Sequence, residues 1–163
     1  MAGIEVNSSE ETSFWSRQVG AMRLQKPAIV PSGTSITKVV MILQDKHYGA
    51  ALVADEKNQL LGIITIHDLM LEFVGSSVSG DAPVDLIMTK DPITVPPEMS
   101  LLEAAAVLHK KGFLHLPVVD RKQKIRGILT ARRVMNFVAE NLPADVLNLP
   151  PDSQITATQK AGG

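Results

Sequence analysis

Apolar side chains recur with helical spacing in two segments of this chain, residues 36–46 and residues 101–111. An apolar residue follows about every three or four positions, so one face of each helix would be apolar and the other polar. Ser35 and Ser100 directly precede these segments. Serine is a preferred residue at a helix N-terminus because its hydroxyl accepts a hydrogen bond from the first turn. The pattern therefore predicts two amphipathic helices.

Between and after these helices, the chain forms nearly continuous apolar runs separated by short charged turns. Such runs favour strands of a sheet that is covered on both faces. A short extended segment before each helix, two strands after it and a closing helix give the order β-α-β-β-α in each half. The predicted strands are residues 28–30, 50–54 and 60–65 in the first half and 93–95, 116–119 and 125–130 in the second; the closing helices are residues 66–74 and 131–140.

The two halves have similar sequences in the same register. Residues 62–70 read GIITIHDLM and residues 127–135 read GILTARRVM. The offset of 65 residues between these segments holds without gaps from residues 30–70 to residues 95–135. Duplication of one supersecondary unit explains this register. We therefore predict an α/β (α+β) fold made of two pseudo-symmetric units.

The repeat also divides the chain into segments. A further helix is expected near residues 10–22, with Trp15 and Val19 on its inner side. Beyond Asn141 the chain is rich in proline, threonine, glutamine and glycine, which is typical of a flexible tail. The expected organisation is an N-terminal extension at residues 1–18, a first unit at 19–75, a linker at 76–83, a second unit at 84–140 and a C-terminal tail at 141–163.

Composition narrows the classes of function. The 163 residues carry a formal net charge of -1, which provides no strong field for nucleic acid or an anionic membrane. The chain contains no cysteine, so disulfides and thiolate metal ligands are excluded. Its start is polar, and no apolar run approaches the roughly 20 residues that span a bilayer. We therefore expect a soluble, cytoplasmic protein without nucleic-acid binding or membrane insertion.

Sequence signatures of catalysis are missing from the chain. It contains no HExxH, no GxSxG, no P-loop and no GxGxxG motif. Its four histidines show no spacing that is typical of a zinc site. We therefore expect neither enzymatic activity nor a metal site.

Three motifs carry a family resemblance. They are MTKDPITV at residues 88–95, LPVVD at residues 116–120 and GIITIHD at residues 62–68. In this order and with this duplication, residues 19–140 resemble a tandem CBS domain pair, also called a Bateman module. The resemblance implies that the units pack sheet to sheet around a pseudo-two-fold axis. It also implies two clefts for adenosine-containing ligands such as AMP, ADP, ATP or S-adenosylmethionine, and a regulatory rather than catalytic role toward an enzyme, channel or transporter.

The resemblance further implies which residues form each cleft, because one copy supports the base while the T-x-x-D pattern of the other holds the ribose. Phe113 and Tyr48 are more commonly core residues than stacking platforms. The first cleft would comprise Ile63, Thr65, His67 and Asp68 together with Thr89, Thr94, Phe113, Leu114 and His115. The second, weaker cleft would comprise Ile128, Thr130, Arg132 and Arg133 together with Ile29, Tyr48, Gly49 and Ala50.

The two copies differ at the ligand position. The Asp68 carboxylate can accept hydrogen bonds from both ribose hydroxyls, and the strand-to-helix junction at Thr65 favours an anion through unpaired N–H groups. Thr65 and Asp68 also fit a helix capping box, which needs no ligand. Arg133 has donors only. The second cleft is therefore either empty or directs Arg132 and Arg133 toward phosphate.

Two classes of function remain open. The chain is either a sensor of an adenosine-containing ligand that acts on a separate, unknown effector protein, or a ligand-free structural module that dimerises. A cyclic dinucleotide or a divalent cation is a further alternative ligand. We expect a homodimer in either case, because apolar side chains on the closing helices would otherwise be exposed. These side chains are Met70, Leu71, Val134, Met135 and Val138.

Overall fold

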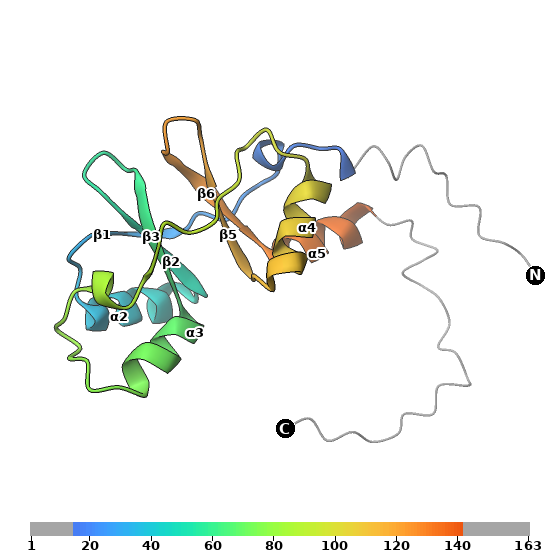
Figure 1. The fold of residues 1–163 in the computed structure, drawn as a ribbon. Helices are drawn as coiled ribbons and strands as arrows, with labels where there is room; N and C mark the ends of the chain where they lie inside the picture. The colour runs from blue at the N-terminus through green and yellow to red at the C-terminus, as the bar shows by residue number, and fades with distance from the viewer. Residues whose placement is uncertain (1–14, 142–163) are drawn as a thin grey trace, which may run out of the picture.

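The computed structural model describes residues 15–141, and its elements follow the duplicated pattern (Figure 1). The predicted helices that follow Ser35 and Ser100 are confirmed, and each serine hydroxyl accepts a hydrogen bond from the first turn. The first unit contains β1 (Ala28–Pro31), α2 (Ile36–Lys46), β2 (Ala50–Ala54), β3 (Leu60–Thr65), α3 (Ile66–Asp68) and a π-helical continuation (Leu69–Val74). The second contains 3-10 helix η3 (Val84–Leu86), β4 (Thr89–Lys90), α4 (Leu101–Lys111), β5 (His115–Val119), β6 (Ile125–Thr130) and α5 (Ala131–Asn141).

The strands form two sheets, ordered β1-β2-β3-β4 and β5-β6. In the first sheet β1 runs parallel to β2, with Val30 opposite Val53. The equivalent pair in the second copy, Val95 and Val118, forms only an isolated parallel bridge. The predicted strand at residues 93–95 is therefore wrong. Pro117 follows β5 residue Leu116 and has no N–H, so the ladder cannot extend beyond Val95 toward residue 93.

The N-terminal segment of each repeat pairs with a strand of the other repeat. β4 pairs with β3, with Thr89 opposite Ile63, although β4 belongs to the second repeat. Conversely, Gln25 bridges to Ile128 of β6. Glycines make this crossing possible: a Cβ at Gly62 would lie 2.5 Å from Met88 Sδ, and one at Gly127 would lie 2.9 Å from Leu24 Cβ. The exchange therefore ties the two units together.

Trp15 is helical, but the predicted helix at residues 10–22 is wrong beyond it. Val19–Ala21 forms one 3-10 turn, and Gln18 bridges to Ser100. The Val19 N–H donates to the Met99 carbonyl (2.9 Å), and the Gly20 N–H donates to the Pro97 carbonyl (2.8 Å). An α-helix would need these donors for its own carbonyls, so the contact with the loop before α4 prevents it. Val19 is nevertheless fully buried, and residues 10–14 lie outside the described part.

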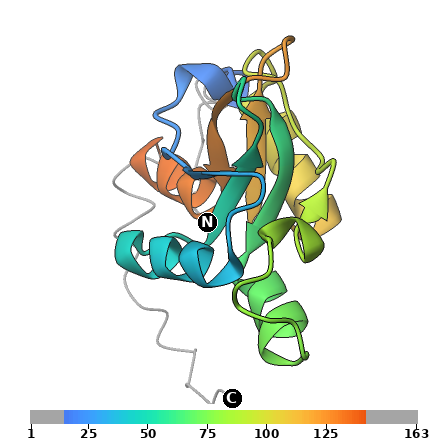
Figure 2. The same cartoon turned by 90° about the vertical axis from the view of Figure 1, so that its left-hand side faces the viewer.

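The apolar core has three parts, one within each unit and one between them. The third cluster includes Leu52 and Ile63 of the first sheet and Ile125 and Ile128 of the second. Figure 2 shows the strands of the two units in the middle of the molecule with the helices outside them. The two sheets therefore pack against each other, and the predicted mixed α/β fold is confirmed.

Candidate functional site

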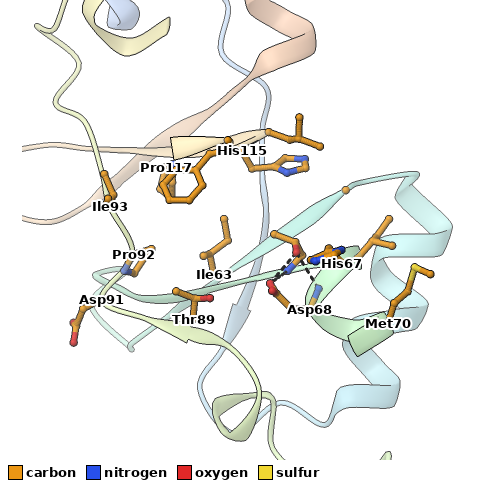
Figure 3. A pocket seen from close by; sticks show the side chains of 16 residues that line it. Ile63, His67, Asp68, Met70, Thr89, Asp91, Pro92, Ile93, His115 and Pro117 are labelled. Carbon is orange, nitrogen blue, oxygen red and sulfur yellow. Dashed lines mark hydrogen bonds between the residues drawn. The ribbon is translucent and has the colours of Figure 1, made fainter. Parts of the chain in front are cut away.

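A cleft with a volume of about 860 Å³ opens where the two units meet (Figure 3). Its walls come from the end of β3, the first turn of α3, the loop after β4 and the start of β5. The lining residues are Gly49, Ile63, Thr65, Ile66, His67, Asp68, Met70, Thr89, Asp91, Pro92, Ile93, Gly112, Phe113, Leu114, His115 and Pro117.

Eight of the nine residues predicted for the first cleft line this one. The exception is Thr94, whose neighbour Ile93 lines the cleft instead. Residues 91–93 all line the cleft, and the lining ends one residue before Thr94 on this segment. Sequence reasoning also missed Asp91 and Pro92, although both lie within the motif at residues 88–95 that was used to identify the family.

Asp68 is held by a capping box at the start of α3. Its Oδ2 atom accepts a hydrogen bond from the Thr65 N–H (2.8 Å) and another from the Thr65 hydroxyl (2.8 Å). The Asp68 N–H in turn donates to Thr65 Oγ1 (3.2 Å). Among the described residues, the protein hydrogen bonds to this carboxylate all go to Oδ2, so Oδ1 keeps its acceptor capacity. The capping interpretation is confirmed, and it leaves one carboxylate oxygen for a ligand.

The first turn of α3 is a weaker anion site than the sequence predicted. The Ile66 N–H donates to the Gly49 carbonyl (3.0 Å), and the Asp68 N–H donates to the Thr65 hydroxyl. Two of the three N–H groups in this turn therefore already have acceptors. A helix N-terminus attracts anions mainly through free N–H groups, so little of that attraction remains here.

The opposite wall brings an imidazole and apolar side chains to the cleft. His115 is half-buried, and this burial lowers the pKa of its imidazole, which is therefore neutral at pH 7. Its ring lies directly against Gly49, because a Cβ there would be 2.6 Å from His115 Nε2. Phe113 and Leu114 are 38% and 67% exposed, which is unusual for large apolar side chains. These residues provide a surface on which a flat apolar group could pack.

The residues predicted for the second cleft do not come together in the same way. Gly49 lines the first cleft, and Tyr48 packs against the core of the first unit. Ala50 and Ile128 are buried in the cluster between the sheets. Ile29 and Arg132 are exposed. The structure thus does not bring these residues together as it does the first set, and a second ligand cleft stays a prediction.

Thr130 and Arg133 repeat half of the capping box. The Thr130 hydroxyl accepts a hydrogen bond from the Arg133 N–H (3.0 Å), as Thr65 does from Asp68. The Arg133 guanidinium instead donates to Glu140 on the same helix (2.9 Å). Its Nε is buried and has no hydrogen-bond partner within residues 15–141. Arg133 thus forms an ion pair with Glu140 on the same helix, α5.

No group of three or more potential metal ligands occurs in the part of the chain that the structure describes. Within the same part, no helix is both long enough and apolar enough to cross a membrane.

Comparison with known proteins identifies the repeat. The family profile of the CBS domain matches twice, at residues 19–75 and 82–140. Inosine-5'-monophosphate dehydrogenase of Nitrosopumilus maritimus (strain SCM1) is 33% identical over 120 residues, which cover 74% of this chain and 24% of that protein. An uncharacterized 17.7 kDa protein of Acidianus ambivalens is 28% identical over 115 residues, covering 71% and 69%. The chain thus spans only about a quarter of the dehydrogenase.

Solved structures show the same fold. CBSX2 in complex with AMP is 26% identical, with a TM-score of 0.66, covering 76% of this chain and 96% of that one. The CBS domain pair of protein MJ0100, in complex with 5'-methylthioadenosine and S-adenosyl-L-methionine, is 25% identical, with a TM-score of 0.66 and coverage of 75% and 99%. An uncharacterized conserved protein from Pyrococcus horikoshii is 20% identical, with a TM-score of 0.72 and coverage of 79% and 97%.

Proposed function

Because the chain belongs to the CBS-domain family and carries two such domains, we propose that it is a regulatory module that binds an adenosine-containing ligand. The ligand would be AMP, ADP, ATP or S-adenosylmethionine, and the module would act on a separate effector protein rather than catalyse a reaction. Structures of similar CBS pairs contain AMP or S-adenosylmethionine, which supports this ligand class. The site would be the cleft beside Asp68.

The observation that carries this proposal is the position of the Asp68 carboxylate. Its Oδ2 is fixed by two hydrogen bonds from Thr65, while Oδ1 remains available at the wall of the cleft. A fixed carboxylate can accept hydrogen bonds from a ribose diol without losing side-chain entropy at the moment of binding. The base would pack between Ile63 and the wall formed by Phe113 and His115. Each group of an adenosine thus finds a complementary surface.

Isothermal titration calorimetry with AMP and S-adenosylmethionine tests the proposal. We expect Asp68→Ala to weaken binding about 30- to 1000-fold, because it removes a charged acceptor of two hydroxyls. Glu103→Ala is a matched control, since Glu103 closes the same kind of capping box with Ser100 (2.7 Å) but lies on α4, outside the cleft. Absence of binding to the wild type, or normal binding to Asp68→Ala, would show that this carboxylate is only a helix cap.

Ligand-free dimerisation is the second candidate, and exposed apolar side chains on the closing helices favour an association surface. Met70, Leu71 and Met135 are each at least 60% exposed. Val134 was expected beside them, but it is 7% exposed and packs in the core with Phe137, so that part of the prediction is wrong. A homodimer through these faces is compatible with ligand binding. A cyclic dinucleotide remains an alternative ligand for the same cleft.

A further inference from the structure

The cleft carries negative charge without a balancing cation. Asp68 and Asp91 both line it. Among the residues that the structure describes, no lysine or arginine does so. Residues 1–14 contain neither lysine nor arginine, and residues 142–163 contain only Lys160. A phosphate group that entered this cleft would therefore face the Asp68 carboxylate, with the exposed Asp91 carboxylate at the rim directed outward (Figure 3), and no lysine or arginine.

We infer that the cleft selects adenosine ligands whose 5' substituent is uncharged or positively charged, such as a thioether or a sulfonium, over ligands with 5' phosphates. This inference rests on the proposed function and names the ligand class of the same cleft. It distinguishes adenosine, 5'-methylthioadenosine and S-adenosylmethionine from AMP, ADP and ATP.

Most of the other groups that could hold a phosphate already have partners, although His67 also lines the cleft. Two of the three N–H groups in the first turn of α3 donate to the Gly49 carbonyl and to the Thr65 hydroxyl. The half-buried imidazole of His115 has a lowered pKa because burial disfavours its charged form, so it is mostly neutral at pH 7. Phosphate sites in proteins are generally built from such N–H groups and from arginine or lysine. The cleft thus offers a phosphate little stabilisation.

One lysine beside the cleft interacts with a carboxylate outside it. Lys90 follows Thr89 in β4, but it lies close enough to Asp85 for its charge to contribute to the lowered pKa of that carboxyl. Adjacent residues of a strand face opposite sides, so Thr89 lines the cleft while Lys90 does not. The sheet geometry therefore keeps this ammonium out of the site.

The remaining lining suits an apolar 5' group. Met70, Ile93 and Leu114 border the cleft together with two prolines, Pro92 and Pro117. A methylthio group would bury its apolar surface among such side chains. A sulfonium carries a positive charge, which Asp68 and Asp91 would attract. Both kinds of substituent therefore fit the walls and the charge of the cleft.

Calorimetric titration of adenosine, 5'-methylthioadenosine, S-adenosylmethionine, AMP and ATP tests the inference. Two unit charges about 8 Å apart change affinity about twofold to thirtyfold, depending on how well water screens them. We therefore expect AMP to bind about twofold to thirtyfold more weakly than 5'-methylthioadenosine at low salt, and ATP more weakly still. This difference should shrink at about 150 mM salt.

Asp91→Asn identifies the source of the selectivity. Asp91 has a φ of 47°, a conformation that asparagine also tolerates, so the substitution removes charge without adding backbone strain. We expect AMP to bind severalfold more tightly to Asp91→Asn while 5'-methylthioadenosine is unaffected. Glu56→Gln is the control, because it removes one charge from the exposed β2–β3 turn at the opposite end of these strands.

The outcomes separate this inference from the proposed function. If AMP or ATP binds the wild type more tightly than 5'-methylthioadenosine, the charge inference is overturned while the proposed function stands. A preference for 5'-methylthioadenosine that is unchanged by salt and by Asp91→Asn would mean selection by shape, and would also overturn it. If none of the five compounds binds, the proposed function fails and the inference fails with it.

Discussion

Gly49→Ala should disturb the contact between Gly49 of the first unit and His115 of the second, which lies at the wall of the cleft. A Cβ at Gly49 would lie 2.6 Å from His115 Nε2 and 2.8 Å from His115 Cε1, well inside van der Waals contact. The backbone cannot easily move away, because the Gly49 carbonyl accepts a hydrogen bond from Ile66 (3.0 Å) and β2 starts at the next residue. Gly49 does not have a positive φ, so the clash is the main effect.

The expected magnitude follows from the cost of overpacking. Adding a methyl group to a well-packed site destabilises a protein by about 1–3 kcal/mol. We expect about 1–2 kcal/mol here, because the His115 imidazole borders the cleft and can turn into it. That movement would fill part of the ligand site and weaken adenosine binding. In a His115→Ala background the obstacle is gone, and Gly49→Ala should then change the free energy of unfolding by less than about 0.5 kcal/mol.

Urea denaturation of the wild type, both single variants and the double variant measures this coupling. Gly33→Ala serves as a control, because Gly33 has a φ of 81° and no atom within 4 Å of a built Cβ. Its destabilisation is conformational and should add to that of His115→Ala. If the changes in the free energy of unfolding caused by Gly49→Ala and His115→Ala are also additive within about 0.5 kcal/mol, Gly49 does not pack against His115 as described.

Three further outcomes are expected. Partial burial alone would raise the pKa of Asp85, but hydrogen bonds from the Ser32 hydroxyl (2.6 Å) and the Gly33 N–H (2.7 Å) lower it below 3.8. Its stabilisation is thus present above pH 3.8 and lost as the pH falls further, so Asp85→Asn should lower Tm at pH 7 but not near about pH 2. Light scattering should give twice 17.6 kDa, and Leu71→Lys should reduce that mass. Deleting residues 150–163, which lie outside the described part, should lower Tm by less than about 5 °C.

The fold could be predicted because the same pattern of helices and strands occurs in both halves of the sequence. Helical spacing, serine caps and apolar strands agreed in both copies. The helices that follow Ser35 and Ser100 and five of the six predicted strands match the structure. The wrong predictions, for the helix at residues 10–22 and the strand at residues 93–95, arise where long-range contacts decide the backbone conformation. Val19 and Gly20 donate their N–H groups to the loop before α4, and Pro117 lacks the N–H that would extend the ladder to residue 93.

Most of the first cleft could be predicted for a different reason. Its residues lie within motifs of the family, and eight of the nine line one cavity. Asp91 and Gly49 were missed or misplaced because their positions depend on how the two units cross. β4 leaves its own repeat to pair with β3, and Gly49 packs against His115 of the other repeat. Contacts between units depend on packing, which the spacing of residues within one unit does not specify.

The difference between Asp68 and Arg133 follows from what a helix cap requires. In both copies a threonine hydroxyl accepts a hydrogen bond from the N–H three residues later, and this bond does not depend on the side chain at that position. The side chain is therefore free to differ between the copies. Asp68 uses one oxygen to complete the capping box and presents the other to the cleft, whereas Arg133 turns along α5 to Glu140. A duplicated cap can thus support one ligand site and one structural ion pair, and this makes an asymmetric module from a symmetric sequence repeat.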